Sequence, residues 1–357
     1  MQKNEMIELL QIQYPIIQAP MAGGITTAEL VAAVSNHGGL GSIGAGYLTP
    51  NQLQEQISQV KHLTTKPFSV NLFVPNEIIT SEKEINRAIQ LLQPIRDKLQ
   101  VPNVSIDFPC SESVMKIFEE QIRIVIEEKV PICSFTFGLP SNDLIVKLKQ
   151  HNTILIGTAT TVTEAIELEK VGMDLIVIQG SEAGGHRGNF IHDVQESLVG
   201  LMSLIPQVVD HVSIPVIAAG GIMDGRGLMA SICLGAKGVQ MGTAFLTCKE
   251  SGAHLLHKET ILQSNEEQTV LTRSFSGKWA RGVKNKFMTE MKEHEKAVPE
   301  YPVQNLLTQS IRKVAAKRND KEYMSLWSGQ SPRLAKNETV EILMKRVINE
   351  ARNIELL

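Results

Sequence analysis

The residues best suited to chemistry lie in one short segment, residues 179–188, which reads QGSEAGGHRG. His186 can exchange a proton near neutral pH or donate a hydrogen bond to a developing anion. The small residues before it let the backbone pass close to a ligand. An isolated histidine is more often structural than catalytic, but these flanks favour a catalytic His186. Arg187 has two interpretations, a ligand for an anionic substrate or a member of a surface ion pair.

Other small or polar residues recur where short apolar runs end. Residues 18–24 read QAPMAGG, which suits either backbone contact with a flat ligand or a tight turn before a helix. Asn71 is polar within the run SVNLF, and its amide suits the edge of a heteroaromatic ring. A hydrogen bond to neighbouring backbone explains Asn71 equally well. The sequences AAGGIMDG (218–225) and QMGT (240–243) mark two further places of this kind.

These segments follow apolar runs that alternate with longer amphipathic stretches, which is the pattern of βα units around a parallel sheet. Thr26 or Thr27, Thr163 and Asp224 are the expected helix N-caps. The fold class is therefore predicted as α/β, a (β/α)8 TIM barrel with a mostly helical second domain. The eight predicted strands span residues 16–19, 40–43, 68–72, 132–135, 154–156, 175–178, 216–219 and 238–241.

In such a barrel the functional groups lie on the loops after the strands. Gly220 and Gly221 follow the seventh predicted strand, and Gly242 and Thr243 follow the eighth. Many barrels bind a phosphate between these two loops through backbone N–H groups. Each pair alone is an ordinary turn, but both together predict a site for a phosphate-bearing ligand.

The alternation of strands and helices stops near residue 250. We therefore expect a barrel domain over residues 1–250, and a helical subdomain over residues 251–357 that packs over the active site. An insertion at about residues 75–112 contains the helical stretch SEKEINRAIQLLQPIRDKL. Such an excursion is typical of a lid or pocket wall, and an outer helix is an equal alternative.

Composition narrows the function classes. Apolar residues make up 43% of the 357 residues, charged residues 20%, and the formal net charge is -3. This balance, without a dense basic stripe, speaks against nucleic acid or an anionic membrane as partner. No apolar run suggests a secretory signal or a membrane helix. Four scattered cysteines suggest reduced thiols and a cytoplasmic location, with a catalytic cysteine left open, and no motif has metal-ligand spacing.

The ordered set of motifs resembles the nitronate monooxygenase family, once called 2-nitropropane dioxygenases, in its class I branch. QAPMAGG, AAVSNHGGLG, TFGLP, QGSEAGGHRG, PVIAAGGIMDGRG and QMGTAF carry the resemblance, and TRSFSG and YMSLWSGQS extend it over nearly the whole chain. The resemblance implies an FMN-binding barrel with His186 as the active-site histidine. The FMN contacts that it implies are Asn71, Gln179, Gly184, Gly221, Gln240, Met241, Gly242 and Thr243.

The resemblance also implies a reaction, the oxidation of alkyl nitronates by O2 to a carbonyl product and nitrite, as detoxification. Propionate 3-nitronate is an expected substrate. His186 is expected to hold the nitronate oxygens, best as the imidazolium, or to take the α-proton of a nitroalkane as general base. Two alternatives remain: an NAD(P)H-dependent FMN reductase of enoyl thioesters or quinones, and a non-catalytic barrel that binds a phosphorylated ligand. A homo-oligomer is possible.

Overall fold

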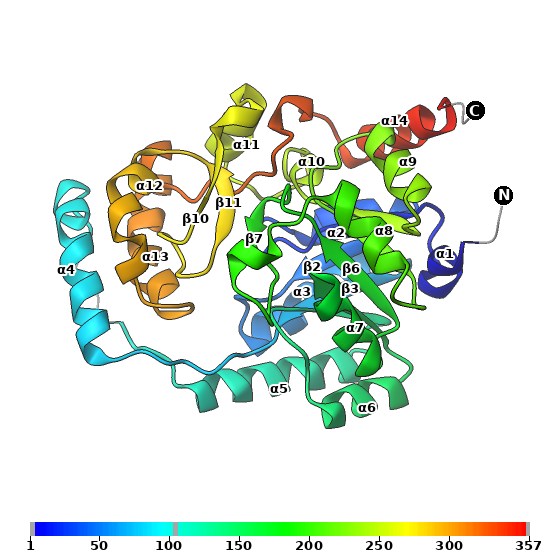
Figure 1. Cartoon of the computed structure of the whole chain (residues 1–357), viewed down its shortest axis with the longest axis horizontal. Helices are drawn as coiled ribbons and strands as arrows, with labels where there is room; N and C mark the ends of the chain where they lie inside the picture. Colours follow the sequence, from blue (N-terminus) through cyan, green and yellow to red (C-terminus); the bar gives the residue numbers. More distant parts are fainter. Residues whose placement is uncertain (1–3, 103–105, 355–357) are drawn as a thin grey trace.

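The structure is a computed structural model that describes residues 4–102 and 106–354, so residues 103–105 of the expected insertion and both chain ends lie outside it. Eight parallel strands form its central barrel (Figure 1). The ring closes between the first and last strands of the sheet, where the Leu40 N–H donates to the Ile16 oxygen over 3.0 Å. All eight predicted strands are confirmed, and the fold is the predicted TIM barrel. The barrel strands are β1 (Ile16–Gln18), β2 (Gly41–Gly44), β3 (Phe68–Phe73), β4 (Ile132–Thr136), β5 (Ile154–Ala159), β6 (Leu175–Gln179), β8 (Val216–Ala219) and β9 (Gly238–Met241).

Helices surround the barrel, and several of them begin at side-chain caps that the sequence carries. Thr27 Oγ1 accepts a hydrogen bond from the Leu30 N–H, and Asp224 caps its helix in the same way. The prediction of Thr163 as a cap is wrong by two residues, because Thr161 has the extended backbone and accepts from the Glu164 N–H. The helices are α1 (Glu5–Leu10), α2 (Ala28–Asn36), α3 (Pro50–Leu63), α5 (Ser111–Glu127), α6 (Asn142–Gln150), α7 (Val162–Lys170), α8 (Leu201–Val209), α9 (Gly225–Cys233), α10 (Thr243–Leu246) and α14 (Val340–Arg352).

Helix α14 comes from the stretch expected in the second domain, yet it packs on the barrel. Its buried residues Val340, Leu343, Val347 and Ala351 recur at helical spacing and join the barrel core. The helix lies against α2 and α9 (Figure 1), and so occupies the place of the eighth barrel helix. The physical reason is that the four-residue α10 is too short to cover β9.

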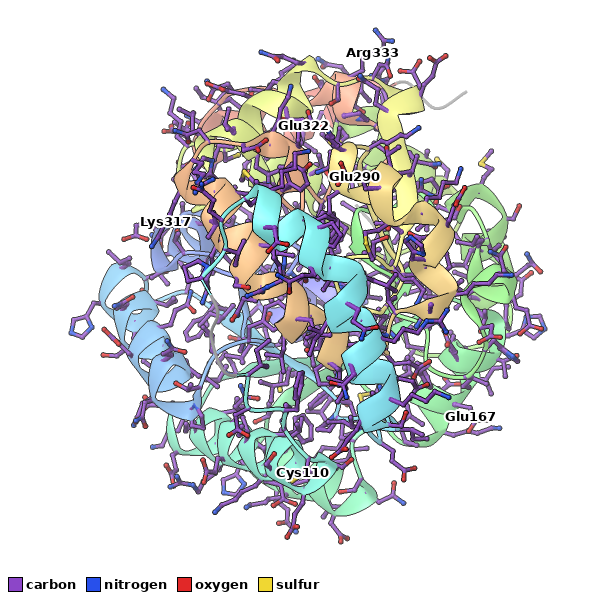
Figure 2. All side chains as sticks on the ribbon, turned by 90° about the vertical axis from the view of Figure 1, so that its left-hand side faces the viewer. Cys110, Glu167, Glu290, Lys317, Glu322 and Arg333 are labelled. Carbon is purple, nitrogen blue, oxygen red and sulfur yellow. The ribbon has the colours of Figure 1, made fainter. Side chains whose placement is uncertain are left out.

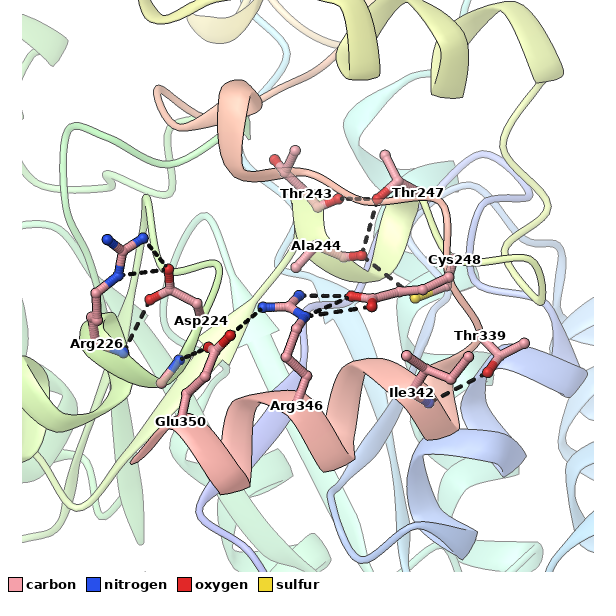
Figure 3. A network of polar contacts seen from close by, with 12 residues as sticks. Asp224, Arg226, Thr243, Ala244, Thr247, Cys248, Thr339, Ile342, Arg346 and Glu350 are labelled. Atoms are coloured by element: carbon pink, nitrogen blue, oxygen red, sulfur yellow. Dashed lines mark hydrogen bonds and ion pairs between the residues drawn. The ribbon is translucent and has the colours of Figure 1, made fainter. Parts of the chain in front are cut away.

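A polar network holds α14 to the loops above the barrel (Figure 3). Arg346 Nη2 lies 2.6 Å from Glu338 Oε1, and Arg346 Nη1 lies 3.4 Å from Glu350 Oε1. The other carboxylate oxygen of Glu350 accepts a hydrogen bond from the Gly225 N–H, at the start of α9. The network therefore fixes α14 to the loop that follows β8.

The substitution Arg346→Met is expected to lower the free energy of unfolding by about 2–3 kcal/mol, because it leaves the poorly exposed carboxylate of Glu338 without its partner. Only 16% of the Arg346 and 10% of the Glu338 side chain is exposed. Urea denaturation measures the loss. Lys345→Met is the matched control, since it breaks an exposed pair with Glu341 and is expected to cost less than about 0.5 kcal/mol. Equal losses in both variants would contradict the prediction.

A second unit packs over one side of the barrel and contains a small antiparallel sheet that the sequence did not reveal. Its strands are β7 (Gly185–His186), β10 (Thr269–Thr272) and β11 (Ala280–Val283). A separate hydrophobic core holds this unit together, and its buried members include Phe275, Phe287 and Leu307. Its helices are α4 (Glu82–Lys98), α11 (Leu255–Gln263), α12 (Lys286–Met291) and α13 (Val303–Lys317). Short 3-10 turns are η1 (Val194–Ser197), η2 (Glu266–Gln268), η3 (Lys292–Ala297), η4 (Lys321–Tyr323) and η5 (Pro332–Leu334).

The insertion supplies α4, which begins at the Ser81 capping box and packs on the outside of α13 (Figure 2). Ala88, Leu92 and Ile95 form its buried face. None of the described residues between 75 and 112 lines the cavity at the barrel end. In its described residues the insertion is thus an outer helix that packs on α13 and forms no wall of this cavity. Within the described ranges, no helix has the length and apolarity that a bilayer span requires.

Candidate active site

A cavity of about 790 Å³ lies at the C-terminal end of the barrel. The loops after β1, β6, β8 and β9 and the ends of β3, β4 and β5 form its floor. Helix α13 forms one wall with Asn305, Gln309, Arg312 and Ala316, which share a face at helical spacing. The cavity therefore joins the barrel to the second unit.

Most residues singled out in the sequence meet in this cavity. Among the expected FMN contacts Met241 is the exception, because its side chain is 1% exposed and packs in the barrel core. Side chains alternate along a strand, so Met241 faces away from the cavity that its neighbour Gln240 lines. The predicted residues that line the cavity are Asn71, Gln179, Gly184, His186, Gly221, Gln240, Gly242 and Thr243.

The loops after β8 and β9 present a rim of backbone donors. Gly221 has a φ of 66°, a left-handed conformation that suits glycine. Among the hydrogen bonds of the described residues, none is donated by the backbone N–H groups of Gly221, Gly242 or Thr243. Such donors at a cavity wall require an acceptor from outside the chain, and a phosphate supplies one.

The segment 328–331 lies directly over this rim. The Gly329 N–H donates to Thr243 Oγ1 over 2.9 Å, and the Gln330 N–H donates to the Glu182 oxygen over 2.9 Å. A Cβ atom on Gly184 would lie 2.5 Å from the Gly329 nitrogen, which no side chain tolerates. Glycine at position 184 thus lets the loop after β6 touch this segment.

The side-chain amides of Asn71 and Gln179 differ in the hydrogen bonds that they make to the protein. Asn71 Nδ2 donates to Ser134 Oγ over 3.0 Å and to Thr136 Oγ1 over 3.2 Å, which orients the amide at the cavity floor. Gln179 Nε2 donates to the His186 oxygen, and Gln179 Oε1 accepts from the Gly188 N–H. Both ends of the Gln179 amide therefore hold the loop that carries His186.

Arg187 is fully buried and lies outside the cavity lining. Its guanidinium donates to the carbonyl oxygens of Gly180, Gln179 and Ser197. Both interpretations from the sequence, an anionic-substrate ligand and a surface ion pair, are wrong. The carbonyl-rich loop after β6 turns back on itself, and Arg187 is the buried donor that holds it in place.

His186 is fixed by backbone pairing and by one side-chain hydrogen bond. Strand β7 pairs His186 with Ala280 of β11. Nε2 of His186 lies 2.8 Å from Ser276 Oγ, and that hydroxyl donates its only hydrogen to the Lys278 oxygen. The hydrogen-bond network therefore assigns the ring hydrogen to Nε2 and leaves the lone pair on Nδ1.

The cavity keeps this imidazole neutral. Burial, and then the positive charges of Lys278 and Arg312, lower the pKa of His186 to about 3. The expectation of an imidazolium is therefore not met, because burial disfavours the charged ring and the two cations beside it oppose a third positive charge. The free lone pair on Nδ1 can accept a proton, but a pKa of about 3 makes the ring a weak base until an anion in the cavity offsets the two cations.

Two cations stand near His186. Lys278 has its ammonium 4.7 Å from the centre of the Phe137 ring, and burial lowers the Lys278 pKa to about 8. Burial also lowers the pKa of Arg312, while Tyr47 opposes that shift. Arg312 stays charged at neutral pH, so the cavity has a positive potential.

Aromatic rings enclose the imidazole. The ring centre of His186 lies 5.5 Å from that of Trp327, 6.1 Å from Phe137 and 6.4 Å from Tyr301. Phe137 has a φ of 77°, which is rare and strained for a bulky residue and is typical of functional sites. This strain places the Phe137 ring in the cavity wall beside His186.

The sequence did not single out several residues that shape the site, namely Ser276, Lys278, Tyr301, Arg312 and Trp327. All five belong to the second unit, whose strand β11 and helix α13 bring them over the barrel. Ser276 lies in TRSFSG and Trp327 in YMSLWSGQS, and these motifs were the available signal.

Comparison with known proteins agrees with this architecture. The family model for nitronate monooxygenase matches residues 3–350. A probable nitronate monooxygenase of Staphylococcus haemolyticus is 53% identical over 358 residues, covering 98% of each chain. The solved structure of a nitroalkane oxidase from Streptomyces ansochromogenes is similar with a TM-score of 0.89 and 35% identity, over 97% of both chains. FabK from Thermotoga maritima gives a TM-score of 0.77 and 31% identity, over 99% of this chain and 97% of that one. With its barrel, its motifs and these matches over almost all of its length, the chain belongs to the nitronate monooxygenase family.

Proposed function

We propose that this protein is an FMN-dependent nitronate monooxygenase, which oxidises alkyl nitronates with O2 to a carbonyl product and nitrite. One observation carries the proposal: a single cavity joins backbone donors that have no partner among the described residues to the neutral imidazole of His186, whose Nδ1 lone pair is free. The rim suits a cofactor phosphate, and the imidazole suits a carbon acid.

The residues present fit FMN. The N–H groups of Gly221, Gly242 and Thr243 would hold the phosphate. Asn71 and Gln240, at the floor of the cavity, would contact the polar edge of the ring system. The volume of about 790 Å³ lies within the usual range for cofactor sites. For Gln179 we propose a supporting role, because its amide already holds the loop of His186, and Met241 retains only a structural one.

FMN, when bound, supplies the oxidation: it takes up electrons from the nitronate and returns them to O2. The chain supplies the rest. Nδ1 of His186 accepts the α-proton when the substrate arrives as a neutral nitroalkane. The positive charges of Lys278 and Arg312 favour the anionic nitronate that remains. The surrounding rings limit the access of water.

Propionate 3-nitronate is the substrate that we propose first, and detoxification of such nitronates in the cytoplasm is the proposed role. The purified protein is expected to consume O2 and release nitrite when mixed with propionate 3-nitronate. An oxygen electrode and a colorimetric nitrite assay measure both. Absence of both in protein with bound flavin contradicts the proposal.

A further inference from the structure

Arg312 is a half-buried cation in the cavity wall, and it lacks an acidic partner in the described part of the chain. Its Nη2 donates to the backbone oxygen of Asn305 over 2.7 Å and to Asn305 Oδ1 over 2.8 Å. Its Nε is buried without a hydrogen-bond partner. The ion pairs of the described residues do not include Arg312. A charged group in this position has donors to spare and a charge that no described residue neutralises.

The backbone directs Arg312 into the cavity. Residues Val303, Leu307 and Ile311 of α13 bury one face of that helix in the core of the second unit. Arg312 belongs to the other face, which lines the cavity. Asn305 lies two turns earlier on the same helix. The hydrogen bonds that Arg312 donates to Asn305 hold the guanidinium against this face. The orientation of Arg312 is therefore built into the helix rather than left to a mobile surface side chain.

We propose that Arg312 is the specificity-determining residue of the site, and that it binds a carboxylate carried by the substrate at the end remote from the nitro group. This inference rests on the proposed function. A planar guanidinium that lines the cavity and has no acidic partner among the described residues is the group that best matches a carboxylate. Arg312 and His186 line the same cavity, so the bound carboxylate shares that cavity with the reacting end.

Anaerobic binding experiments test the assignment without catalytic turnover, because O2, the terminal oxidant, is absent. Calorimetric titration at mildly acidic pH compares 3-nitropropionate with 1-nitropropane, which has the same chain without the carboxylate. The wild-type holoenzyme is expected to bind 3-nitropropionate more tightly, by on the order of 10- to 100-fold, and Arg312→Met is expected to abolish that preference. Arg312→Gln, which keeps a donor to Asn305, is the second variant, and it is expected to lose the preference too.

Lys317→Met is the matched control, because Lys317 lies on the same helix but is exposed and outside the cavity (Figure 2). It is expected to keep the preference. Equal binding of the two compounds by the wild-type protein overturns the assignment, and so does an equal loss of both compounds in the Arg312 variants. If the preference depends on Arg312 but propionate 3-nitronate is not oxidised, the proposed function fails and the carboxylate site stands.

Discussion

Replacing His186 by glutamine is expected to lower kcat/KM for a neutral nitroalkane by about 10²-fold or more, because the base that removes the α-proton is lost. A preformed nitronate needs no such proton transfer, and its oxidation is expected to fall far less. Glutamine can still donate to Ser276 Oγ, so the fold of the loop is retained. Steady-state O2 uptake with 1-nitropropane and with propyl-1-nitronate measures both losses.

The pH dependence of kcat/KM for the wild-type enzyme tests the same prediction in a second way. Because burial and the neighbouring cations lower the pKa of His186 to about 3, the base is free throughout the range from weakly acidic to neutral pH. The wild-type kcat/KM for nitroalkanes is therefore expected to show no fall through the ordinary histidine pKa near 6.5. His192→Gln, a change at a distant exposed histidine, is the control. Equal loss of nitroalkane and nitronate activity in His186→Gln excludes the general-base role.

Placing a carboxylate at position 242 is expected to remove the cofactor. Gly242→Asp sets a negative charge at the rim where the phosphate of FMN would bind, and two charges at about 4 Å repel by about 4 kcal/mol near a protein surface. The affinity for FMN is expected to fall by on the order of 10²- to 10³-fold. Titration of the apoprotein with FMN, followed by flavin fluorescence, measures this change.

Gly242→Ala is the matched control for this rim. Position 242 has a φ of -103°, and an added Cβ would meet only the Ala19 Cβ at 3.6 Å, an ordinary contact. The alanine variant is therefore expected to bind FMN with near wild-type affinity. Retention of FMN by both variants would show that the phosphate lies elsewhere.

The barrel could be predicted from the sequence because each strand is a short apolar run that ends at small residues. The eight strands have nearly the predicted bounds, and the segment around His186 follows β6 as expected. The sheet of β7, β10 and β11 could not be predicted. Strand β7 is two residues long inside a glycine-rich loop, and β11 reads ARGV, which shows no alternation.

The parts of the site that come from distant segments escaped prediction for a different reason. A charged residue on an amphipathic helix normally faces water, so Arg312 gave no sign that it lines a cavity. The apolar face of α14 was visible as a helical pattern, but a pattern does not say which surface it will cover. The neutral state of His186 depends on Lys278 and Arg312, which only the folded chain brings near it.

The most direct test of the central claim is anaerobic mixing of the flavin-loaded protein with its possible reductants, followed by visible absorption. If the cavity joins FMN to a nitronate site, propionate 3-nitronate is expected to bleach the flavin rapidly, while NADH and NADPH leave it oxidised. Rapid bleaching by NADH or NADPH, with none by the nitronate, would contradict the account and identify a nicotinamide-dependent reductase instead.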